Sequence, residues 1–321
     1  MSTTVEVATP SRLHFGMFSF GCTDERQFGG AGVMIDRPGL RVRLTEADRF
    51  EVVGPLAHRI PQVVRRLGES WNFTEPPTCR IEVLSAPVEH LGIGTGSQLE
   101  LAVAAGLNAF LGRPPLDALS LARLTGRGAR SAIGTYGFLQ GGLLVESGKR
   151  PGELLAPLEY RIALPPAWRW VLIFPNSERG LAGEAEQQAF RDLPPVPRET
   201  TARLRAEAID SLAPAAASGD FVPFSESLYR FGHLAGTCFA PSQGGPFASP
   251  RAARLVDLMR DLGIRGVGQS SWGPALFAVL ETAEAALRFG AVLVQQLEPG
   301  EQWLIAETSH CGARLTRWDE S

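Results

Sequence analysis

A short glycine-rich segment offers the first sign of chemistry in this sequence. Residues 92–98 read GIGTGSQ and lie between an alternating stretch, Cys79–Ser85, and a strongly helical run, Ser97–Leu111. Glycines let backbone N–H groups approach an anion closely, and a helix N-terminus adds unpaired donors and partial positive charge. The segment predicts a phosphate site formed by Gly92, Gly94, Thr95, Gly96, Ser97 and Gln98. Ordinary helix capping by these residues is the alternative.

The spacing within this segment excludes two common phosphate motifs. A Walker loop requires GxxxxGK[ST], but the only lysine of the chain, Lys149, lies far from the glycines. The dinucleotide pattern GxGxxG also fails, because the next glycine after Gly96 is Gly106. Any mechanism that needs a catalytic lysine would have to use Lys149.

Several arginines are candidates for binding anions, because the guanidinium fork matches phosphate and carboxylate groups. Arg12 and His14 share one face at the end of a predicted strand. Arg26 lies in a loop before two glycines, and Arg130 and Arg179 follow other predicted elements. For each of these residues, an ordinary solvated surface position is the alternative.

Further polar residues lie in a second glycine-rich segment, residues 266–273. Gln269, Ser270 and Ser271 offer small polar groups to a ligand or simply form a tight turn. Trp272 either stacks on an aromatic substrate or fills the core. Glu186 is a candidate Mg²⁺ ligand acting through water, although a glutamate in a first helical turn also favours the helix dipole. The remaining histidines show no metal-ligand spacing.

Composition excludes several classes of function. The chain has 321 residues, 44% of them hydrophobic, with a net charge of −3, so no basic field favours nucleic acid. The four cysteines form no CxxC pair, which argues against zinc. No signal peptide or membrane-length apolar run is visible. We therefore expect a cytoplasmic protein that binds neither nucleic acid nor membrane.

The order of predicted elements favours an α+β fold. Strands are expected over 3–13, 33–44 and 50–53, with a break at Arg37-Pro38-Gly39, and over 79–85, 141–146, 169–174, 275–280 and 302–307. Helices are expected over 57–67, 97–111, 116–124, 183–191, 198–212, 218–236, 249–262 and 282–296. Strands and helices do not alternate regularly, which is typical of α+β proteins. The predicted domains are residues 1–155 and 156–321.

Three motifs in this order resemble those of the GHMP kinase superfamily: Pro10–Gly16, Pro87–Gln98 and Gly266–Gly273. That resemblance implies a GHMP-kinase-like fold, with an N-terminal half like ribosomal protein S5 domain 2 and a ferredoxin-like C-terminal half. In detail the chain is similar to the β-ribofuranosylaminobenzene 5′-phosphate synthases over about residues 5 to 310. The matching segments are Pro10–Gly16, 26–30, Gly92–Gln98, 134–138 with Gly141-Gly142, 179–183 with Glu186, 243–245 and Gly268–Gly273.

This resemblance implies a pentosyltransferase of tetrahydromethanopterin biosynthesis. Such enzymes join 5-phosphoribosyl-1-pyrophosphate to 4-aminobenzoate or 4-hydroxybenzoate, release pyrophosphate and carbon dioxide, and need Mg²⁺. It implies catalytic roles for Arg12, His14, Arg26 and Arg179, and substrate contacts for Arg130, Thr135, Gln243 and residues 269–272, beside the phosphate loop. Ala182 departs from the serine expected there. Family analogy also suggests a homodimer.

Two other functions remain as alternatives. One is an ATP-dependent GHMP-type kinase, which commonly uses an aspartate beside a lysine to activate the acceptor hydroxyl. No aspartate lies between Asp117 and Asp192, which disfavours a kinase. The other is an inactive sensor of sugar phosphates or nucleotides. A synthase that displaces pyrophosphate needs neither a strong base nor a covalent nucleophile, but only charge stabilisation and positioning.

Overall fold

The computed structural model describes residues 2–22, 24–176 and 183–320, and within them the chain forms one seven-stranded and one four-stranded sheet. The first sheet has the order β11-β1-β2-β4-β3, with β5 paired to β2 and β6 paired to β5. Its strands are β1 (Ser2–Ser19), β2 (Phe28–Glu46), β3 (Glu51–Val53), β4 (Cys79–Ser85), β5 (Leu143–Glu146), β6 (Leu158–Ile162) and β11 (Arg314–Glu320). The second sheet, with the order β10-β7-β9-β8, consists of β7 (Arg169–Phe174), β8 (Gly266–Gln269), β9 (Leu276–Leu280) and β10 (Gln302–Glu307).

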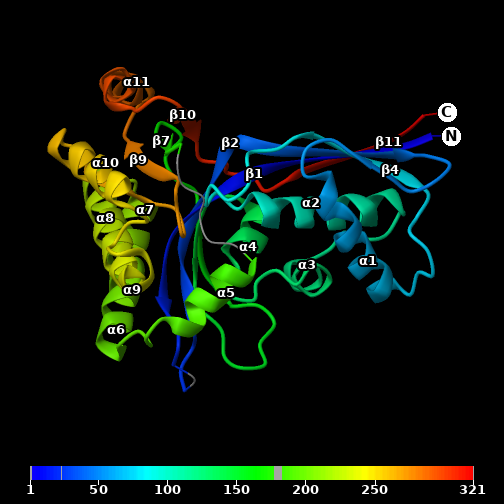
Figure 1. Ribbon diagram of the computed structural model, residues 1–321, viewed down its shortest axis with the longest axis horizontal. Coiled ribbons are helices and arrows are strands. Elements are labelled where there is room, and N and C mark those ends of the chain that lie inside the picture. Colours follow the sequence, from blue (N-terminus) through cyan, green and yellow to red (C-terminus); the bar gives the residue numbers. More distant parts are fainter. Residues whose placement is uncertain (1, 23, 177–182, 321) are drawn as a thin grey trace.

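Each sheet is covered by its own helices (Figure 1). The first sheet packs against η1 (Ala57–Arg59), α1 (Ile60–Trp71), α2 (Thr95–Phe110), α3 (Ala118–Thr125) and α4 (Ile133–Gln140). The second part of the chain carries α5 (Gly183–Asp192), α6 (Arg198–Ala206), η2 (Glu207–Leu212), α7 (Ala213–Ser218), α8 (Phe221–Thr237), α9 (Ala240–Gln243), α10 (Pro250–Asp261), α11 (Ala283–Leu293) and η3 (Val294–Gln296). This mixture of helices and strands confirms the predicted α+β class. In the described part of the chain, no helix is long and apolar enough to cross a membrane.

The long strands β1 and β2 join the two halves. Phe15 and Phe18, near the end of β1, pack with Trp170 of β7 and with α8 in one buried cluster. On its other face the second sheet packs against α10 and α11 through residues such as Val171. Because one strand supplies side chains to both cores, a site at the end of β1 is held rigidly between the halves.

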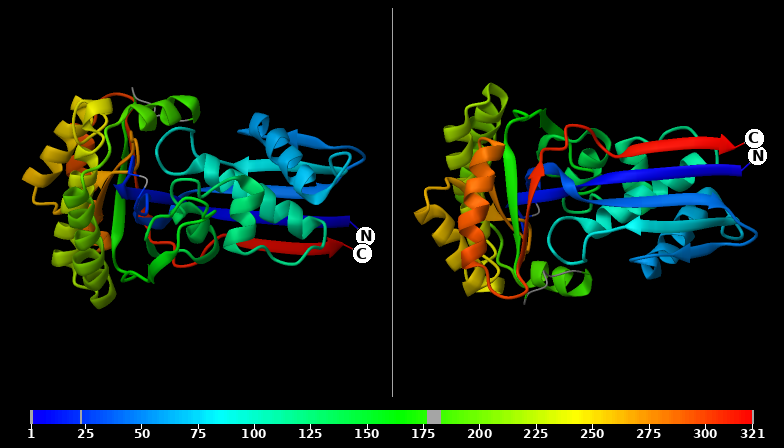
Figure 2. Two further views of the ribbon diagram at one scale, coloured as in Figure 1. Left: turned by 90° about the horizontal axis from the view of Figure 1, so that it is seen from below. Right: turned by 90° about the horizontal axis from the view of Figure 1, so that it is seen from above.

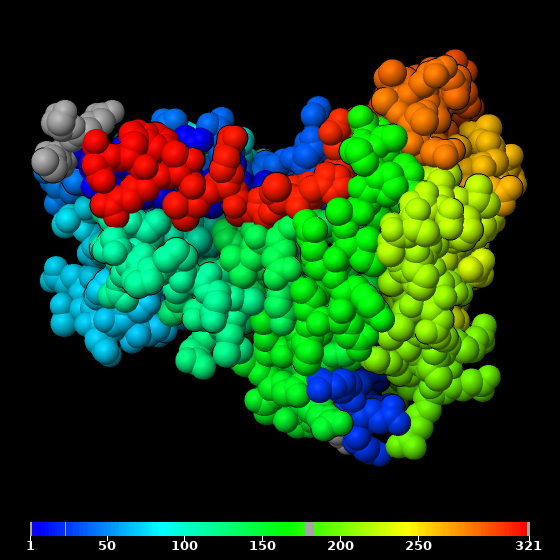
Figure 3. Space-filling view, turned by 180° about the vertical axis from the view of Figure 1, so that it is seen from behind, coloured from blue at the N-terminus to red at the C-terminus, as the bar shows by residue number. Residues whose placement is uncertain are grey.

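The C-terminal strand returns to the first half. β11 pairs antiparallel with β1, from Ser2↔Glu320 to Ala8↔Arg314, so the two ends of the chain lie side by side (Figure 2). In the space-filling view, the red C-terminal segment lies along the N-terminal half (Figure 3). The domain boundary near residue 155 stays a prediction, although β6 and β11, which both follow it in the sequence, pair within the first sheet.

Some predicted elements were wrong or missing. β2 runs through the predicted break at Arg37-Pro38-Gly39, where the register to β1 shifts between Thr9 and Ser11 and the extra residues bulge out. β6, β8 and β11 were not expected. Neither was α4, whose Gly134 and Gly137 weaken its helical signal. A Cβ on Gly137 would lie 2.2 Å from the sulfur of Met34, so packing against β2 requires glycine there.

Candidate active site

The three motifs meet along the second half of β1. The backbone N–H of Arg12 donates to the carbonyl of Ile93 (2.9 Å), and that of His14 donates to the Ser270 hydroxyl (3.0 Å). The same hydroxyl donates to the carbonyl of Gly92 (2.8 Å). Ser270 is fully buried, and its hydroxyl therefore ties the motifs together. Its predicted contact with phosphate stays a prediction.

A cleft of about 610 Å³ opens over these motifs. Its walls are the phosphate loop, the end of η1, the segment before α4, and the start of α5. The predicted site residues that line it are Arg12, His14, Gly92, Gly94, Thr95, Gly96, Ser97, Arg130, Glu186 and Ser271. Met17, His58, Arg59, Glu89, His90, Arg127 and Ser131 line it as well.

The start of α2 forms one wall of this cleft. Gly94 caps the helix in the left-handed region (φ 80°), and no acidic residue occupies the first turn. The first N–H groups of α2 have no helical acceptor, and the helix dipole places partial positive charge there. A Cβ on Gly92 would lie 2.5 Å from the carbonyl oxygen of Ser270, so only glycine fits between the two motifs. The geometry is suited to an anion.

Two arginines that line the cleft are fixed by a buried glutamate. Glu100, on α2, accepts from Arg59 Nη2 (3.1 Å) and from Arg127 Nε (2.8 Å) and is only 7% exposed. Arg59 also donates to Glu89 (2.7 Å). Sequence analysis missed this arrangement. Its only signal was a single charged residue, Glu100, in the otherwise apolar run of α2.

The floor of the cleft is a buried polar cluster. Arg12 projects its guanidinium beside the loop, and its Nε has no hydrogen-bond partner in the structure. Gln98 donates through Nε2 to the carbonyl of Gly134 (3.0 Å), whereas its Oε1 and the Thr135 hydroxyl are buried without a partner. Neither Gln98 nor Thr135 is among the residues that line the cleft, and Gly134 lies beside both Arg12 and Gln98. Their predicted contacts with a ligand stay predictions.

His14 is a neutral histidine at neutral pH. Burial, together with the nearby charge of Arg12, lowers the pKa of His14 to about 3. Its Nε2 lies 3.1 Å from the hydroxyl of Ser131. The ring is therefore held in one orientation and offers a hydrogen bond without a charge.

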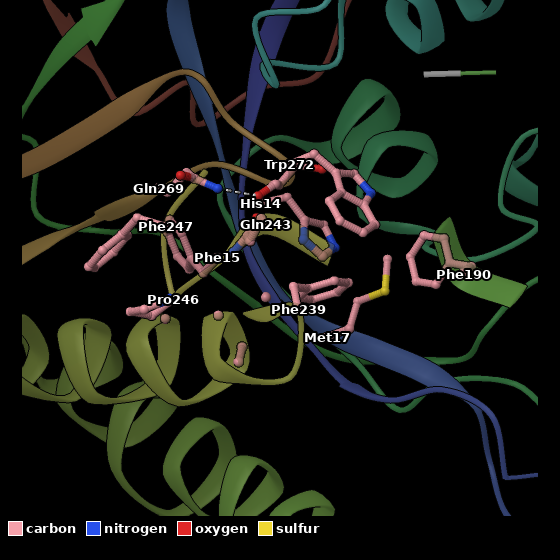
Figure 4. Close-up of a pocket in the computed structure, with 15 residues that line it drawn as sticks. His14, Phe15, Met17, Phe190, Phe239, Gln243, Pro246, Phe247, Gln269 and Trp272 are labelled. Atoms are coloured by element: carbon pink, nitrogen blue, oxygen red, sulfur yellow. Dashed lines mark hydrogen bonds between the residues drawn. The ribbon is translucent and has the colours of Figure 1, made fainter. Parts of the chain in front are cut away.

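An aromatic pocket adjoins the cleft and shares His14, Met17 and Ser271 with it. Figure 4 shows the side chains that line this pocket. The Trp272 and Phe239 rings lie 4.7 Å apart between centroids, and Phe190 lies 5.4 Å from Trp272. The indole of Trp272 packs in a buried cluster and also lines this pocket, and its stacking on an aromatic substrate stays a prediction. Met17 points toward the same space (Figure 4).

Two predicted glutamines belong to the aromatic pocket rather than to the anion cleft. Gln243 lines it and donates to the carbonyl of Gly245 (3.0 Å). Gln269 accepts from the N–H of Ala248 (2.6 Å) and donates to the carbonyl of Ser271 (3.1 Å). Gln269 therefore fixes the turn that presents Ser271 and Trp272.

The structure does not bring every predicted residue to the cleft. Arg26 lines a separate surface hollow, and its guanidinium is committed to Glu153 (2.7 Å) and to the carbonyl of Gly148 (2.9 Å). Arg179, and the departure at Ala182, lie outside the described residues. Glu186 lines the cleft but forms an ion pair with Arg130.

Comparisons with known proteins agree with the motifs. Residues 212–297 match the family described as GHMP kinases C terminal. The chain is 28% identical over 303 residues to β-ribofuranosylphenol 5′-phosphate synthase of Methanothermobacter thermautotrophicus, covering 86% of this chain and 88% of that protein. It is 26% identical over 296 residues to the Archaeoglobus fulgidus protein of the same name, with 87% and 88% covered.

Solved structures show the same fold. A homoserine kinase from Cytophaga hutchinsonii superimposes with a TM-score of 0.69 at 17% identity, over 98% of this chain and 97% of that one. Streptococcus pneumoniae phosphomevalonate kinase gives 0.69 at 13% identity, over 96% and 100%. The predicted GHMP-kinase-like fold is confirmed. The predicted resemblance to the synthases is confirmed by the relatives, and with it the expectation of an enzyme.

Proposed function

We propose that this chain joins 5-phosphoribosyl-1-pyrophosphate to a para-substituted benzoate, releasing pyrophosphate and carbon dioxide. One observation carries the proposal: a cationic cleft and an aromatic pocket share a wall formed by His14, Met17 and Ser271. A phosphorylated sugar and an aromatic ring bound in these two spaces would meet at His14. The names of the relatives describe a product of this kind, a ribofuranosyl phosphate joined to a phenol. The place of the reaction in tetrahydromethanopterin biosynthesis is what the resemblance to the synthases implies.

The donor's phosphates would bind at the start of α2. There the loop N–H groups and the arginines Arg12, Arg59 and Arg127 supply positive charge. Charge-assisted bonds of this kind are the strong ones, because donor and acceptor are both ionised.

Magnesium would bind together with the pyrophosphate. The described residues contain no group of three or more acidic, histidine or cysteine side chains that could hold a metal. The carboxylates that line the cleft are Glu89 and Glu186, and each is paired with an arginine. This set fits a cation held mainly by phosphate oxygens, with Glu186 as a water-mediated contact. The metal would neutralise charge on the leaving pyrophosphate.

The acceptor ring would bind at the aromatic pocket, against Trp272, Phe239 and Phe190. The pocket encloses only about 30 Å³ and the Trp272 and Phe239 rings already touch, so these side chains would have to move apart to admit the ring fully. Offset or edge-to-face contacts with these side chains would orient the ring. Because His14 is uncharged, it would form no ion pair with the benzoate carboxylate. Such a pair would stabilise the carboxylate and oppose the loss of carbon dioxide. The word phenol in the relatives' name favours 4-hydroxybenzoate, whose decarboxylated ring is a phenol, over 4-aminobenzoate.

The reaction balances without a covalent enzyme intermediate. The bond between the anomeric carbon and pyrophosphate breaks, and its electron pair leaves with pyrophosphate. The ring carbon that bears the carboxylate forms the new carbon–carbon bond. The bond to the carboxylate then breaks, and its electrons restore the aromatic ring. The protein supplies position and charge stabilisation for the oxocarbenium-like sugar.

The test is direct incubation of the purified chain with phosphoribosyl pyrophosphate and Mg²⁺. Each benzoate is supplied with a ¹³C-labelled carboxyl group, and products are identified by mass spectrometry. We expect a ribosyl phosphate adduct of the ring, one pyrophosphate and one labelled carbon dioxide per turnover. An adduct that retains the label, or no adduct with either benzoate, would refute the proposal. A parallel incubation with ATP and small alcohols tests the kinase alternative, for which phosphorylated alcohol is the signature.

A further inference from the structure

A buried carboxylate lies behind the cleft and takes no part in the contacts described so far. Glu146 ends β5 and is fully buried, between Gly30 of β2 and Leu158 of β6 in the sheet. Its Oε2 accepts from the backbone N–H of Ala132 (2.6 Å). Its Oε1 has no hydrogen-bond partner among the residues that the structure describes.

The groups around Glu146 connect it to the floor of the cleft. The hydroxyl of Ser131, next to Ala132, acts to lower the pKa of this carboxyl and also lies 3.1 Å from His14 Nε2. Arg12, whose Nε is likewise buried without a partner, acts on Glu146 through its charge. The other charged or titratable groups that act on Glu146 are Lys149, after β5, and Tyr136 of α4.

We propose that Glu146 is the buried counter-charge that positions Arg12, and that it takes up a proton when an anion binds over Arg12. This inference rests on the proposed function, which places phosphates at that point. Without a ligand, the negative charge of ionised Glu146 balances the positive charge of the buried Arg12 guanidinium. When an anion binds, the guanidinium gains a closer negative partner, and a second buried negative charge becomes unfavourable. A proton on Glu146 removes that repulsion.

The electrostatics support this arrangement. Burial raises the pKa of Glu146 to about 7, although the Ser131 hydroxyl, the Ala132 N–H and the Arg12 charge act in the opposite direction. The carboxyl is thus poised to gain or lose a proton near neutral pH. Burial also lowers the pKa of Arg12, and the charges of Glu186 and Glu146 oppose that effect.

The test uses sulfate, because its charge does not change between pH 6 and pH 8. If sulfate raises the pKa of Glu146 by one unit, linkage predicts binding about fivefold tighter at pH 6 than at pH 8, and uptake of about half a proton at pH 7.5. Calorimetry in buffers of different ionisation enthalpy measures both quantities. The Glu146→Gln variant keeps an acceptor for the Ala132 N–H and should lose both effects. The exposed control Glu281→Gln should keep them.

The outcomes separate this proposal from its alternatives. His58 and His90 also line the cleft, and they remain in Glu146→Gln. Proton uptake that persists in that variant would therefore overturn the proposal, as would pH-independent sulfate binding by the wild type. Infrared difference spectra of the wild type alone should show a protonated carboxyl band when sulfate is added, and its absence would also overturn the proposal. Proton uptake without any synthase turnover would instead refute the proposed function and leave this inference standing.

Discussion

Replacing Gly96 by alanine should weaken donor binding while leaving the fold at least as stable. A Cβ at this position would lie 2.5 Å from Arg59 Nη1 and 3.0 Å from its Cζ, so the guanidinium has to move away from the loop. Losing one charge-assisted hydrogen bond to a phosphate costs about 1.5–3 kcal/mol, or roughly a 10- to 100-fold rise in KM for phosphoribosyl pyrophosphate. Gly96 is the second residue of α2 and has no positive φ, so alanine adds no backbone strain there and should stabilise the helix by less than about 1 kcal/mol.

Gly68→Ala provides the matched control. Gly68 lies within α1, and a Cβ there meets only Phe73 at an ordinary 3.6 Å. It should gain similar stability with an unchanged KM. Urea denaturation gives the free energy of unfolding, and initial rates with varied donor give KM. If Gly96→Ala binds the donor as well as the control does, the inferred contact between Arg59 and the phosphates is wrong.

Four further results are expected. Arg12→Ala should lower kcat by roughly 10² to 10³, as for other preorganised donors that stabilise developing charge; wild-type turnover would contradict the assigned role. Trp272→Phe should raise KM for the benzoate but not for the donor, and an equal change in both would place the ring elsewhere. Activity should be lost in excess chelator and return with Mg²⁺; full activity in chelator would exclude the metal. The pKa of Glu146, raised to about 7, makes its contribution to stability fall as pH rises from about 4.5 through 7. In urea denaturation, the free energy of unfolding of Glu146→Gln should therefore exceed that of the wild type by as much as about 3 kcal/mol at pH 8 and should equal it at pH 4. Equal changes at both pH values would show that ionisation of Glu146 is not the cause.

Sequence patterns predicted the elements with a long apolar alternation or helical periodicity, and missed short or glycine-bearing elements such as β8 and α4 as well as the largely exposed β11. The strand Cys79–Ser85 alternates between buried and part-exposed residues, and it was predicted with its observed bounds. β11 reads RLTRWDE, without a consistent apolar face, and it becomes a strand because β1 offers a free edge. Such an edge is set by tertiary structure, which no local pattern records.

The site shows the same division between local and distant causes. The phosphate loop was predictable, because glycines before a helix are a local signal. Glu100 and Glu146 were not, since each is a single charge within an apolar element whose partners come from elsewhere in the chain. Arg26 was assigned a catalytic role by resemblance alone, and the structure instead pairs it with Glu153.

The charged residues of the cleft also bear on whether this kinase-like fold is suited to phosphoryl transfer or to the proposed pentosyl transfer. No lysine or aspartate is among the described residues that line the cleft, and its two carboxylates, Glu89 and Glu186, are held by arginines. Lys149 instead pairs through its backbone with Gln27, at the loop that follows β1. A kinase that uses a carboxylate as its base must transfer a proton to it from the acceptor hydroxyl, and Glu89 and Glu186 are both already paired with arginines. The proposed transfer needs no such base. Pyrophosphate leaves with the electron pair of its bond to the sugar, and loss of carbon dioxide leaves an electron pair with the ring. The protein has to supply only fixed positive charge, which the cleft provides, and a site that orients the ring, which we assign to the aromatic pocket.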